Sequence, residues 1–366
     1  MYDVAIVGAG PAGSILARNL PPGTQACVIE ARDFTATHVP PRQTRAYGAL
    51  VAPDAQRLLA EMDIALPAGV LVGPQVFSVR AVDWESRLER YYQRNYINID
   101  REMFDRYLAE QIPDTVQTSY STRVTGIVTH HDHVEIRAAR GDRSFTERAR
   151  VVVGADGARS FVRSTIEDRI KHRPRYAVIQ HRFALQNPLH HFTVVFDPAV
   201  TDYYSWAIPK GDQVLIGSAQ RYGRQAMERF GRVVSHMRSL GLDLGPQIAR
   251  EFAFIEQPRR PAEVLSGHDR IVLVGEAARL ISPSSAEGLS YAFASALALS
   301  DCLSGGTEGV AERYRRSLRS LRTAIGYKNL KRAAMSCAPL RRLALRSGIG
   351  SIRSDRPQAG LTPLVS

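Results

Sequence analysis

The amino-acid sequence predicts an α/β protein, and three observations support this class. Three apolar strands each run into a glycine-containing turn and then a helix-like segment, at residues 2–18, 149–163 and 270–290. The stretches between them hold shorter strand-like runs, such as residues 192–196 and 213–217. Hydrophobic residues make up 44% and charged residues 23% of the 366-residue chain, a balance typical of a globular protein with a buried core.

The first strand opens a βαβ unit of the kind that binds dinucleotides. The strand ends at Gly8, a helix begins at Pro11, and a second short strand delivers Glu30 twenty residues after Gly10. Gly8 permits a tight turn, Gly10 lets a pyrophosphate approach the backbone, and Gly13 allows close helix–strand packing. The helix N-terminus attracts phosphate, and Glu30 suits a ribose 2′-hydroxyl. The dinucleotide contacts expected from this unit are Gly8, Gly10, Pro11, Ala12, Gly13, Glu30, Ala31 and Arg32.

Two later segments favour a flavin over a nicotinamide dinucleotide. In the first, an apolar strand reaches the tight turn Gly154-Ala-Asp156-Gly157. In the second, an apolar strand ends at Gly275-Glu276, and a helix rich in small residues follows near residue 287. Each segment presents an acid directly after a buried strand.

With the βαβ unit, these segments resemble the three fingerprints of FAD-dependent enzymes that share the para-hydroxybenzoate-hydroxylase fold. Glu276 takes the place of the aspartate in that family's Gly-Asp-Ala-Ala block and keeps a carboxylate there. Within the fold, the chain is most similar to the geranylgeranyl-reductase family, in particular to bacterial FAD-linked oxidoreductases of the CbrA type. The resemblance covers almost the whole chain and is carried by residues 50–56, 74–79, 91–98, 204–210, 275–295 and 338–342.

The resemblance implies an FAD cofactor, a discontinuous Rossmann-like FAD-binding domain, an antiparallel β-sheet substrate domain and C-terminal helices. The substrate pocket is expected between the second sheet and the flavin. The implied domains are residues 1–70, 96–165 and 265–310 for FAD, residues 71–95 and 166–264 for the substrate, and residues 311–366 for the basic helical segment. The implied further FAD contacts are Arg45, Ala49, Arg101, Val124, Asp156, Gly157, Gly275, Glu276, Gly288 and Leu289.

The segment Ser284-x-x-Glu287 has the spacing of a capping box. It predicts a helix that starts just before Gly288 and Leu289. Their N–H groups would then face the pyrimidine end of the flavin, where negative charge develops on reduction.

Aromatic residues are the expected catalytic and substrate-contacting groups. Tyr204 and Trp206 share one face of a predicted strand, and the resemblance turns that face toward the pocket; a packed sheet core is the alternative. Relatives commonly read Lys-Pro-Cys-Gly-Gly where this chain has Arg45-Ala-Tyr47-Gly48-Ala49. Tyr47 therefore replaces a cysteine beside the flavin, and it is the candidate proton donor or substrate orienter, with a plain pocket wall as the alternative.

The expected function is FAD-dependent oxidoreduction, with hydride transferred from reduced FAD to a carbon–carbon double bond of an apolar or isoprenoid-like substrate. A flavin monooxygenase of the aromatic hydroxylase or epoxidase type and a non-enzymatic flavoprotein are the alternatives. Residues 204–209 also resemble a halogenase motif, but the lysine that halogenases carry before it is missing, since the first lysine is Lys171. No second glycine-rich unit is present for NAD(P)H, so that donor either binds transiently at the flavin or is replaced by a partner protein.

The net charge of +12 is concentrated at the C-terminal end, where residues 313–356 hold thirteen Arg or Lys and one acid. The same segment carries an apolar stripe at helical spacing, formed by Ile325, Leu330, Ala334, Leu340 and Leu343. The favoured expectation is a helix that packs this stripe on the body; peripheral contact with an anionic membrane is the alternative, and nucleic-acid binding is not expected.

Three dispersed cysteines and the lack of a leader-like or membrane-spanning apolar run predict a cytoplasmic protein, either free or at the inner membrane surface. The histidines of residues 130–133 lie between two strand-like runs, so they predict an exposed hairpin turn and no metal site. The sequence leaves the oligomeric state open.

Overall fold

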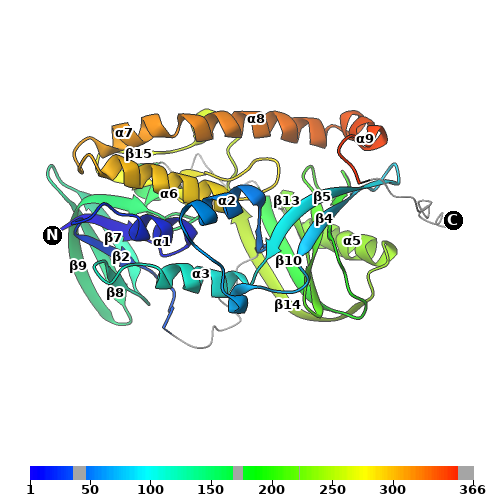
Figure 1. The fold of residues 1–366 in the computed structure, drawn as a ribbon, viewed down its shortest axis with the longest axis horizontal. Helices are drawn as coiled ribbons and strands as arrows, with labels where there is room; N and C mark the ends of the chain where they lie inside the picture. Colours follow the sequence, from blue (N-terminus) through cyan, green and yellow to red (C-terminus); the bar gives the residue numbers. More distant parts are fainter. Residues whose placement is uncertain (36–46, 168–175, 222, 353–366) are drawn as a thin grey trace.

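Two eight-stranded sheets lie side by side along the long axis of the molecule (Figure 1). The computed structural model describes residues 1–35, 47–167, 176–221 and 223–352. The mixed α/β class and the helical C-terminal part expected from the sequence are confirmed.

The first sheet contains the dinucleotide-type βαβ unit. Its strand order is β15-β16-β9-β1-β2-β6, with β8 paired to β9 and β7 paired to β8. Ile6 of β1 lies opposite Val28 on one side and Val153 on the other, both in parallel register. The strands are β1 (Tyr2–Val7), β2 (Ala26–Ile29), β6 (Gln117–Ser119), β7 (Arg123–Thr129), β8 (Val134–Arg140), β9 (Arg143–Gly154), β15 (Gly267–His268) and β16 (Ile271–Leu273). Residues 4–7 of β1, all of β2 and residues 151–154 of β9 are buried and lack polar side chains, because both faces of the sheet are covered there.

Helices α1 (Pro11–Arg18), α2 (Pro53–Glu61), α3 (Arg101–Glu110) and α6 (Leu289–Leu303) bury their apolar sides against this sheet and one another. α6 packs on both α1 and α2 (Figure 1). The start of α1 follows directly from the sequence, because Pro11 at the first helical position lacks an N–H that the helix could not have used.

The second sheet has the order β14-β10-β13-β12-β11-β4-β5-β3. Its strands are β3 (Leu50–Val51), β4 (Val76–Asp83), β5 (Leu88–Asn98), β10 (Tyr176–Leu185), β11 (Phe192–Phe196), β12 (Ser205–Lys210), β13 (Gln213–Arg221) and β14 (Leu244–Ile255). Helix α5 (Ala226–Ser239) packs Phe230, Val233 and Met237 against it. The sheet is antiparallel except where β11 runs parallel to β4. These two strands come from distant segments, so no hairpin forces them to be antiparallel.

The outermost helices are α7 (Val310–Ser317), α8 (Arg319–Ser336) and α9 (Ala338–Ser347), and they run along one side of the molecule (Figure 1). The expectation that the whole apolar stripe packs on the body is wrong. Ile325 is buried, whereas Leu330, Leu340 and Leu343 are exposed, because only one side of these helices meets the rest of the fold. Within the described residues, no helix is long and apolar enough to cross a membrane.

The strands β7 and β8 are joined by residues 130–133, which confirms the expected hairpin turn. The rings of His130 and His133 stack there at 4.5 Å. Among the described residues, no group of three or more metal-ligating side chains is present. Cys27 is buried in β2, as its place in an apolar strand predicts.

Candidate functional site

A cleft of about 1110 Å³ lies between the two sheets, and residues from both of them line it. The first sheet contributes its strand ends and the start of α1, and the second contributes residues from several of its strands. The sequence-predicted residues on its wall are Gly8, Gly10, Pro11, Ala12, Glu30, Ala31, Arg32, Tyr47, Ala49, Arg101, Val124, Asp156, Gly157, Tyr204, Trp206, Glu276, Gly288 and Leu289. Gly13 and Gly275 are not on the wall, and Arg45 lies outside the described residues.

The glycines of the first turn have different structural roles. Gly8 has φ of +105°, and a Cβ there would lie 2.7 Å from the carbonyl oxygen of Ala155. A Cβ at Gly13 would overlap the carbonyl oxygen of Gly8, so Gly13 is needed for packing. At Gly10 only the Arg32 guanidinium comes within 4 Å, at 3.8 Å. Gly10 therefore leaves the helix N-terminus, with its free N–H groups, open to a phosphate.

Glu30 holds this turn together from the end of β2. Its carboxylate accepts hydrogen bonds from the backbone N–H of Ala9 at 2.7 Å and of Arg32 at 2.8 Å. The carboxylate also faces the cleft, where the predicted contact with a ribose would be made. The sequence thus indicated the position of this acid but not its second task, which is to fix the backbone of the glycine turn.

A buried acid that sequence reasoning missed lies between two predicted arginines. Asp105 accepts from Arg32 Nη1 and from Arg101 Nε, both at 2.7 Å. Burial opposes ionisation of this carboxyl, but Arg101 and Arg32 outweigh it and hold the pKa of Asp105 below its ordinary value. The charged pair of arginines on the cleft wall is suited to a pyrophosphate. The i,i+4 spacing of Arg101 and Asp105 on α3 was the available signal.

Tyr47 lies next to this cluster. The Arg101 guanidinium is 4.0 Å from the centre of the Tyr47 ring, which is a cation–π contact. Two residues on, Ala49 has φ of +49°, and its carbonyl oxygen accepts a hydrogen bond from Lys210 Nζ at 2.9 Å. Tyr47 is therefore held between a cation and a fixed stretch of backbone on the cleft wall.

Asp156 shapes the turn after β9. Its carboxylate accepts from the hydroxyl of Ser160 and from the backbone N–H groups of Phe161, at 2.6 Å, and Val162, at 3.1 Å. Burial raises the pKa of Asp156 despite these hydrogen bonds. Gly157 follows with φ of +81°. Both residues line the cleft, and the hydrogen bonds of Asp156 fix the part of its wall that follows β9.

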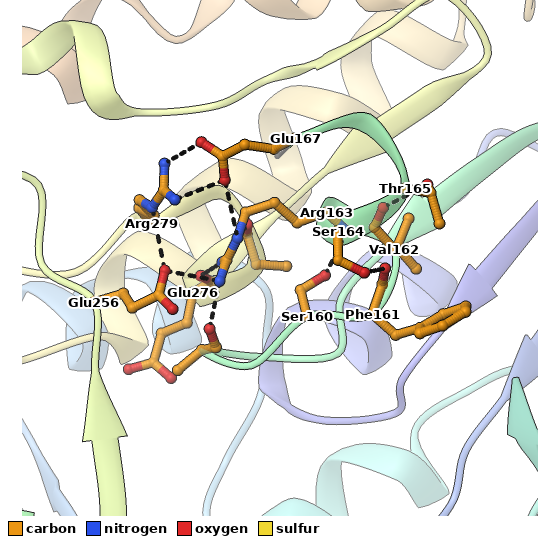
Figure 2. A network of polar contacts seen from close by, with 12 residues as sticks. Ser160, Phe161, Val162, Arg163, Ser164, Thr165, Glu167, Glu256, Glu276 and Arg279 are labelled. Carbon is orange, nitrogen blue, oxygen red and sulfur yellow. Dashed lines mark hydrogen bonds and ion pairs between the residues drawn. The ribbon is translucent and has the colours of Figure 1, made fainter. Parts of the chain in front are cut away.

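A network of four charged residues ties the two sheets together at one end of the cleft (Figure 2). Arg163 and Arg279 follow β9 and β16 of the first sheet, and Glu256 follows β14 of the second. Glu256 accepts from Arg163 at 2.8 Å and from Arg279 at 3.2 Å, and Glu167 binds Arg279 through both oxygens. Arg163 also donates to the backbone carbonyls of residues 158, 276 and 277. Sequence reasoning missed this network because its members are remote in the chain.

Helix α6 begins at Leu289, where the sequence predicts it, but the capping box does not form. Instead, the Glu287 carboxylate accepts from the backbone N–H of Ser290 at 2.8 Å and from its hydroxyl at 2.7 Å. Ser284 lies in a turn and makes no cap bond to the helix, because residues 282–286 fold back on themselves. Gly288 lies beside the Glu276 carboxylate. A Cβ added at Gly288 would lie 3.6 Å from Glu276 Oε1. The helix N-terminus thus faces the cleft with Gly288 as its cap.

The second sheet presents Tyr204 and Trp206 to the cleft. The Tyr204 hydroxyl donates to the carbonyl of Ser285 at 2.7 Å, and burial raises its pKa, so it is a poor acid. The Trp206 indole N–H donates to Gln180 Oε1 at 2.9 Å. The amide of Gln180 in turn donates to Glu251 at 2.6 Å and to the Tyr47 carbonyl at 3.1 Å. Trp206 therefore belongs to the sheet core and also forms part of the wall.

Three features of the cleft fit a dinucleotide: the glycine turn, the paired arginines and the open helix N-termini. The aromatic wall then fits the flavin half of FAD. A family model described as FAD binding domain matches residues 1–318, and the chain belongs to this family. It is 36% identical over 353 residues to the protein CbrA of Escherichia coli O6:H1, and the match covers 96% of this chain and 94% of that protein.

Two solved structures show the same fold. A geranylgeranyl bacteriochlorophyll reductase-like protein from Thermoplasma acidophilum superposes with a TM-score of 0.80 at 19% identity, over 93% of this chain and 90% of that one. The probable FAD-dependent monooxygenase PqsL of Pseudomonas aeruginosa superposes with a TM-score of 0.67 at 20% identity, over 95% and 99% of the two chains. The protein is thus a member of the FAD binding domain family, and it shares its fold with a reductase-like protein and with a probable monooxygenase.

Proposed function

We propose that the protein is an FAD-dependent reductase that adds hydrogen across a carbon–carbon double bond of an apolar, isoprenoid-like substrate. One observation carries this proposal. Every described cleft residue within the strands of the second sheet is apolar or aromatic: Leu50, Tyr96, Val178, Phe192, Trp206, Ile208, Phe252, Ala253, Phe254 and Ile255. Such a wall offers an apolar chain a dry surface and offers a charged substrate no partner.

The FAD-facing residues fit the group through the open N-terminus of α1, the arginines bridged by Asp105 and the N-terminus of α6. When bound, FAD supplies the hydride. Gly288 and Leu289 present the N-terminus of α6 to the cleft, where it stabilises negative charge on a reduced cofactor. The match to the FAD binding domain model supports the cofactor, and the likeness to the reductase-like structure supports the reductase assignment.

The second hydrogen arrives as a proton, and Tyr47 is the candidate donor. Its ring lines the cleft under the Arg101 guanidinium, so a cation lies next to the group that would become negative on proton release. Tyr204 is less suited, since its hydroxyl is already donated to Ser285. Trp206, held by Gln180, positions the apolar chain. The electrons come either from NAD(P)H bound transiently at the cleft or from a partner protein.

The test is an analysis of the reaction products formed without oxygen and in air. The purified holoprotein is reduced with dithionite without oxygen and mixed with a polyprenyl alcohol such as geranylgeraniol. We expect a product that gains two hydrogen atoms. A product that gains one oxygen atom, formed only in air with NADPH, would contradict the reductase and establish the monooxygenase alternative that the likeness to PqsL supports.

The proton-donor role is tested by Tyr47→Phe, with Tyr92→Phe on β5, off the cleft wall, as its matched control. We expect Tyr47→Phe to lower turnover about 100-fold while FAD content stays unchanged, because general acids contribute on this order. Unchanged turnover would show that Tyr47 lines the cleft without donating a proton.

A further inference from the structure

We propose that the outer side of α8 and α9 is a docking surface for an anionic lipid bilayer. The surface, called here the basic apolar face, comprises Tyr327, Leu330, Lys331, Leu340, Leu343 and Arg346, all of them exposed. It lies on the outermost layer of the fold, on the helices that run along one side of the molecule (Figure 1).

Apolar side chains gather on this side. Among the described residues, fourteen large hydrophobic side chains are exposed, and six of them fall within residues 327–352. Tyr327 is 72% exposed, Leu330 70% and Leu343 65%. Tyr327 and Leu330 are three residues apart on α8, as are Leu340 and Leu343 on α9, so each pair shares one helix face. A gathering of this kind marks a surface that binds another apolar phase.

Positive charge accompanies the apolar residues. Residues 313–352 contain eleven Arg or Lys and no acid. Some of these cations are used by the fold, as when Arg341 pairs with Asp83 and Arg342 with Glu85. Among the described residues, Lys331 and Arg346 form no ion pair with an acid. Burial and the neighbouring cations Arg94 and Lys328 lower the pKa of Lys331. Exposed apolar residues flanked by unpaired cations are the pattern of helices that lie in the interface of an anionic membrane.

The basic apolar face is held in a fixed orientation. Arg341 Nε meets Asp83 Oδ2 at 2.7 Å, in a buried ion pair that attaches α9 to the end of β4. On α8, Ile325 is buried, and Asn329 donates to the carbonyl of Pro258 at 3.2 Å. The inward sides of both helices are therefore bound to the body, and their outward sides stay exposed in the folded protein.

Two other occupants fit less well. A second copy of the chain would bring two acid-free, strongly basic helices together, and like charges would repel. A nucleic acid would neutralise the cations but leave Leu330 and Leu343 in contact with a polar backbone. A bilayer satisfies both features, since the leucines enter the acyl region while Lys331 and Arg346 reach anionic headgroups.

The experiment is co-sedimentation of the purified holoprotein with vesicles. One set contains phosphatidylcholine alone, and the other contains phosphatidylcholine and phosphatidylglycerol in equal parts. We expect binding to the anionic vesicles only, with a loss of affinity as salt is raised. The variant Leu330→Glu/Leu343→Glu should lose at least about tenfold in affinity. The variant Lys331→Gln/Arg346→Gln should lose about fivefold for each charge.

The matched control is Met103→Glu on α3, since Met103 is 47% exposed and α3 lies on the side of the molecule opposite α8 (Figure 1). It should bind vesicles as the unaltered protein does, and all variants should keep their flavin absorbance. The proposal is overturned if anionic vesicles do not sediment the protein, or if the leucine variant binds them normally. It is also overturned if the leucine variant breaks a dimer, or if the face binds DNA or RNA, without any vesicle binding.

Discussion

The two walls of the cleft are built in opposite ways. The wall from the first sheet is rich in turn backbone and charged groups, and one part of it, Gly8, Gly10 and the start of α1, lies within a single turn of the chain. The wall from the second sheet consists of apolar side chains drawn from β3, β5, β10, β11, β12 and β14. Under the proposed function the first is the cofactor wall and the second the substrate wall. A local motif specifies part of the first wall, whereas the second depends entirely on how distant strands are assembled.

The largest expected effect comes from breaking the network that joins the two walls. In Glu256→Ala, Arg163 and Arg279 lose their shared acid while they remain buried. We expect the free energy of unfolding to fall by about 3–5 kcal/mol, measured by urea denaturation. The control is Glu312→Ala, because Glu312 pairs with Arg315 and Arg316 on the exposed surface of α7, and stability should then stay unchanged. Equal effects of the two changes would show that the network does not hold the walls together.

The next largest expected effect comes from a change in the cofactor wall alone. In Gly13→Ala the added methyl group collides with the carbonyl oxygen of Gly8, so the turn must shift. We expect a loss of about 2–3 kcal/mol in stability and a lower FAD content, read from the visible spectrum of the purified protein. Gly231→Ala in α5 meets nothing within 4 Å and should be neutral or slightly stabilising. A Gly13→Ala protein with full flavin content would refute the packing role.

A change in the substrate wall should leave the cofactor in place. Gln180→Leu removes the acceptor of the Trp206 indole N–H and one of the donors to the Glu251 carboxylate, which keeps its contact with Arg182. We expect about 2 kcal/mol of destabilisation, a raised KM for the apolar substrate and an unchanged FAD content. The exposed Gln93→Leu on β5 is the control and should behave as the unaltered protein does. If Gln180→Leu loses FAD and leaves KM unaltered, the two walls are not functionally separate.

The last expected effect is a slope in the pH dependence of stability, which is small over any one pH unit. Burial lowers the pKa of Lys210 from 10.5 to about 7, although three oxygens, from Ala49, Asn98 and Ile99, accept hydrogen bonds from its ammonium group. Between these two values the unfolded chain binds the proton more strongly than the folded one. The free energy of unfolding should therefore rise with pH in this window, by at most about 1.4 kcal/mol per pH unit.

The contribution of Lys210 is complete above pH 10.5 and is lost as the pH falls through about 7. Urea denaturation at several pH values measures the slope. Lys210→Met should abolish it and Lys328→Met, on α8, should keep it. A slope that survives Lys210→Met would assign it to another group.

The sequence predicted what local chemistry determines. The βαβ unit is one contiguous segment, so the amino-acid sequence alone was enough to place Gly8, Gly10 and Glu30. Gln180 and Trp206 are 26 residues apart, and Asn98 and Lys210 are 112 apart. These side chains form hydrogen bonds only after the strands assemble, so no local sequence pattern indicates the contact. The capping box was predicted wrongly for a related reason. Its spacing is present, but Ser284 lies in the turn of residues 282–286 and does not reach the N-terminus of α6.

The order of the strands has a consequence for protein engineering. The chain passes between the two sheets four times, after β2, β5, β9 and β14. No single cut separates a cofactor module from a substrate module, and neither half can be transplanted as one continuous gene segment. New substrate specificity is therefore more readily reached by replacing individual wall side chains, such as Phe192 or Ile208, than by exchanging domains.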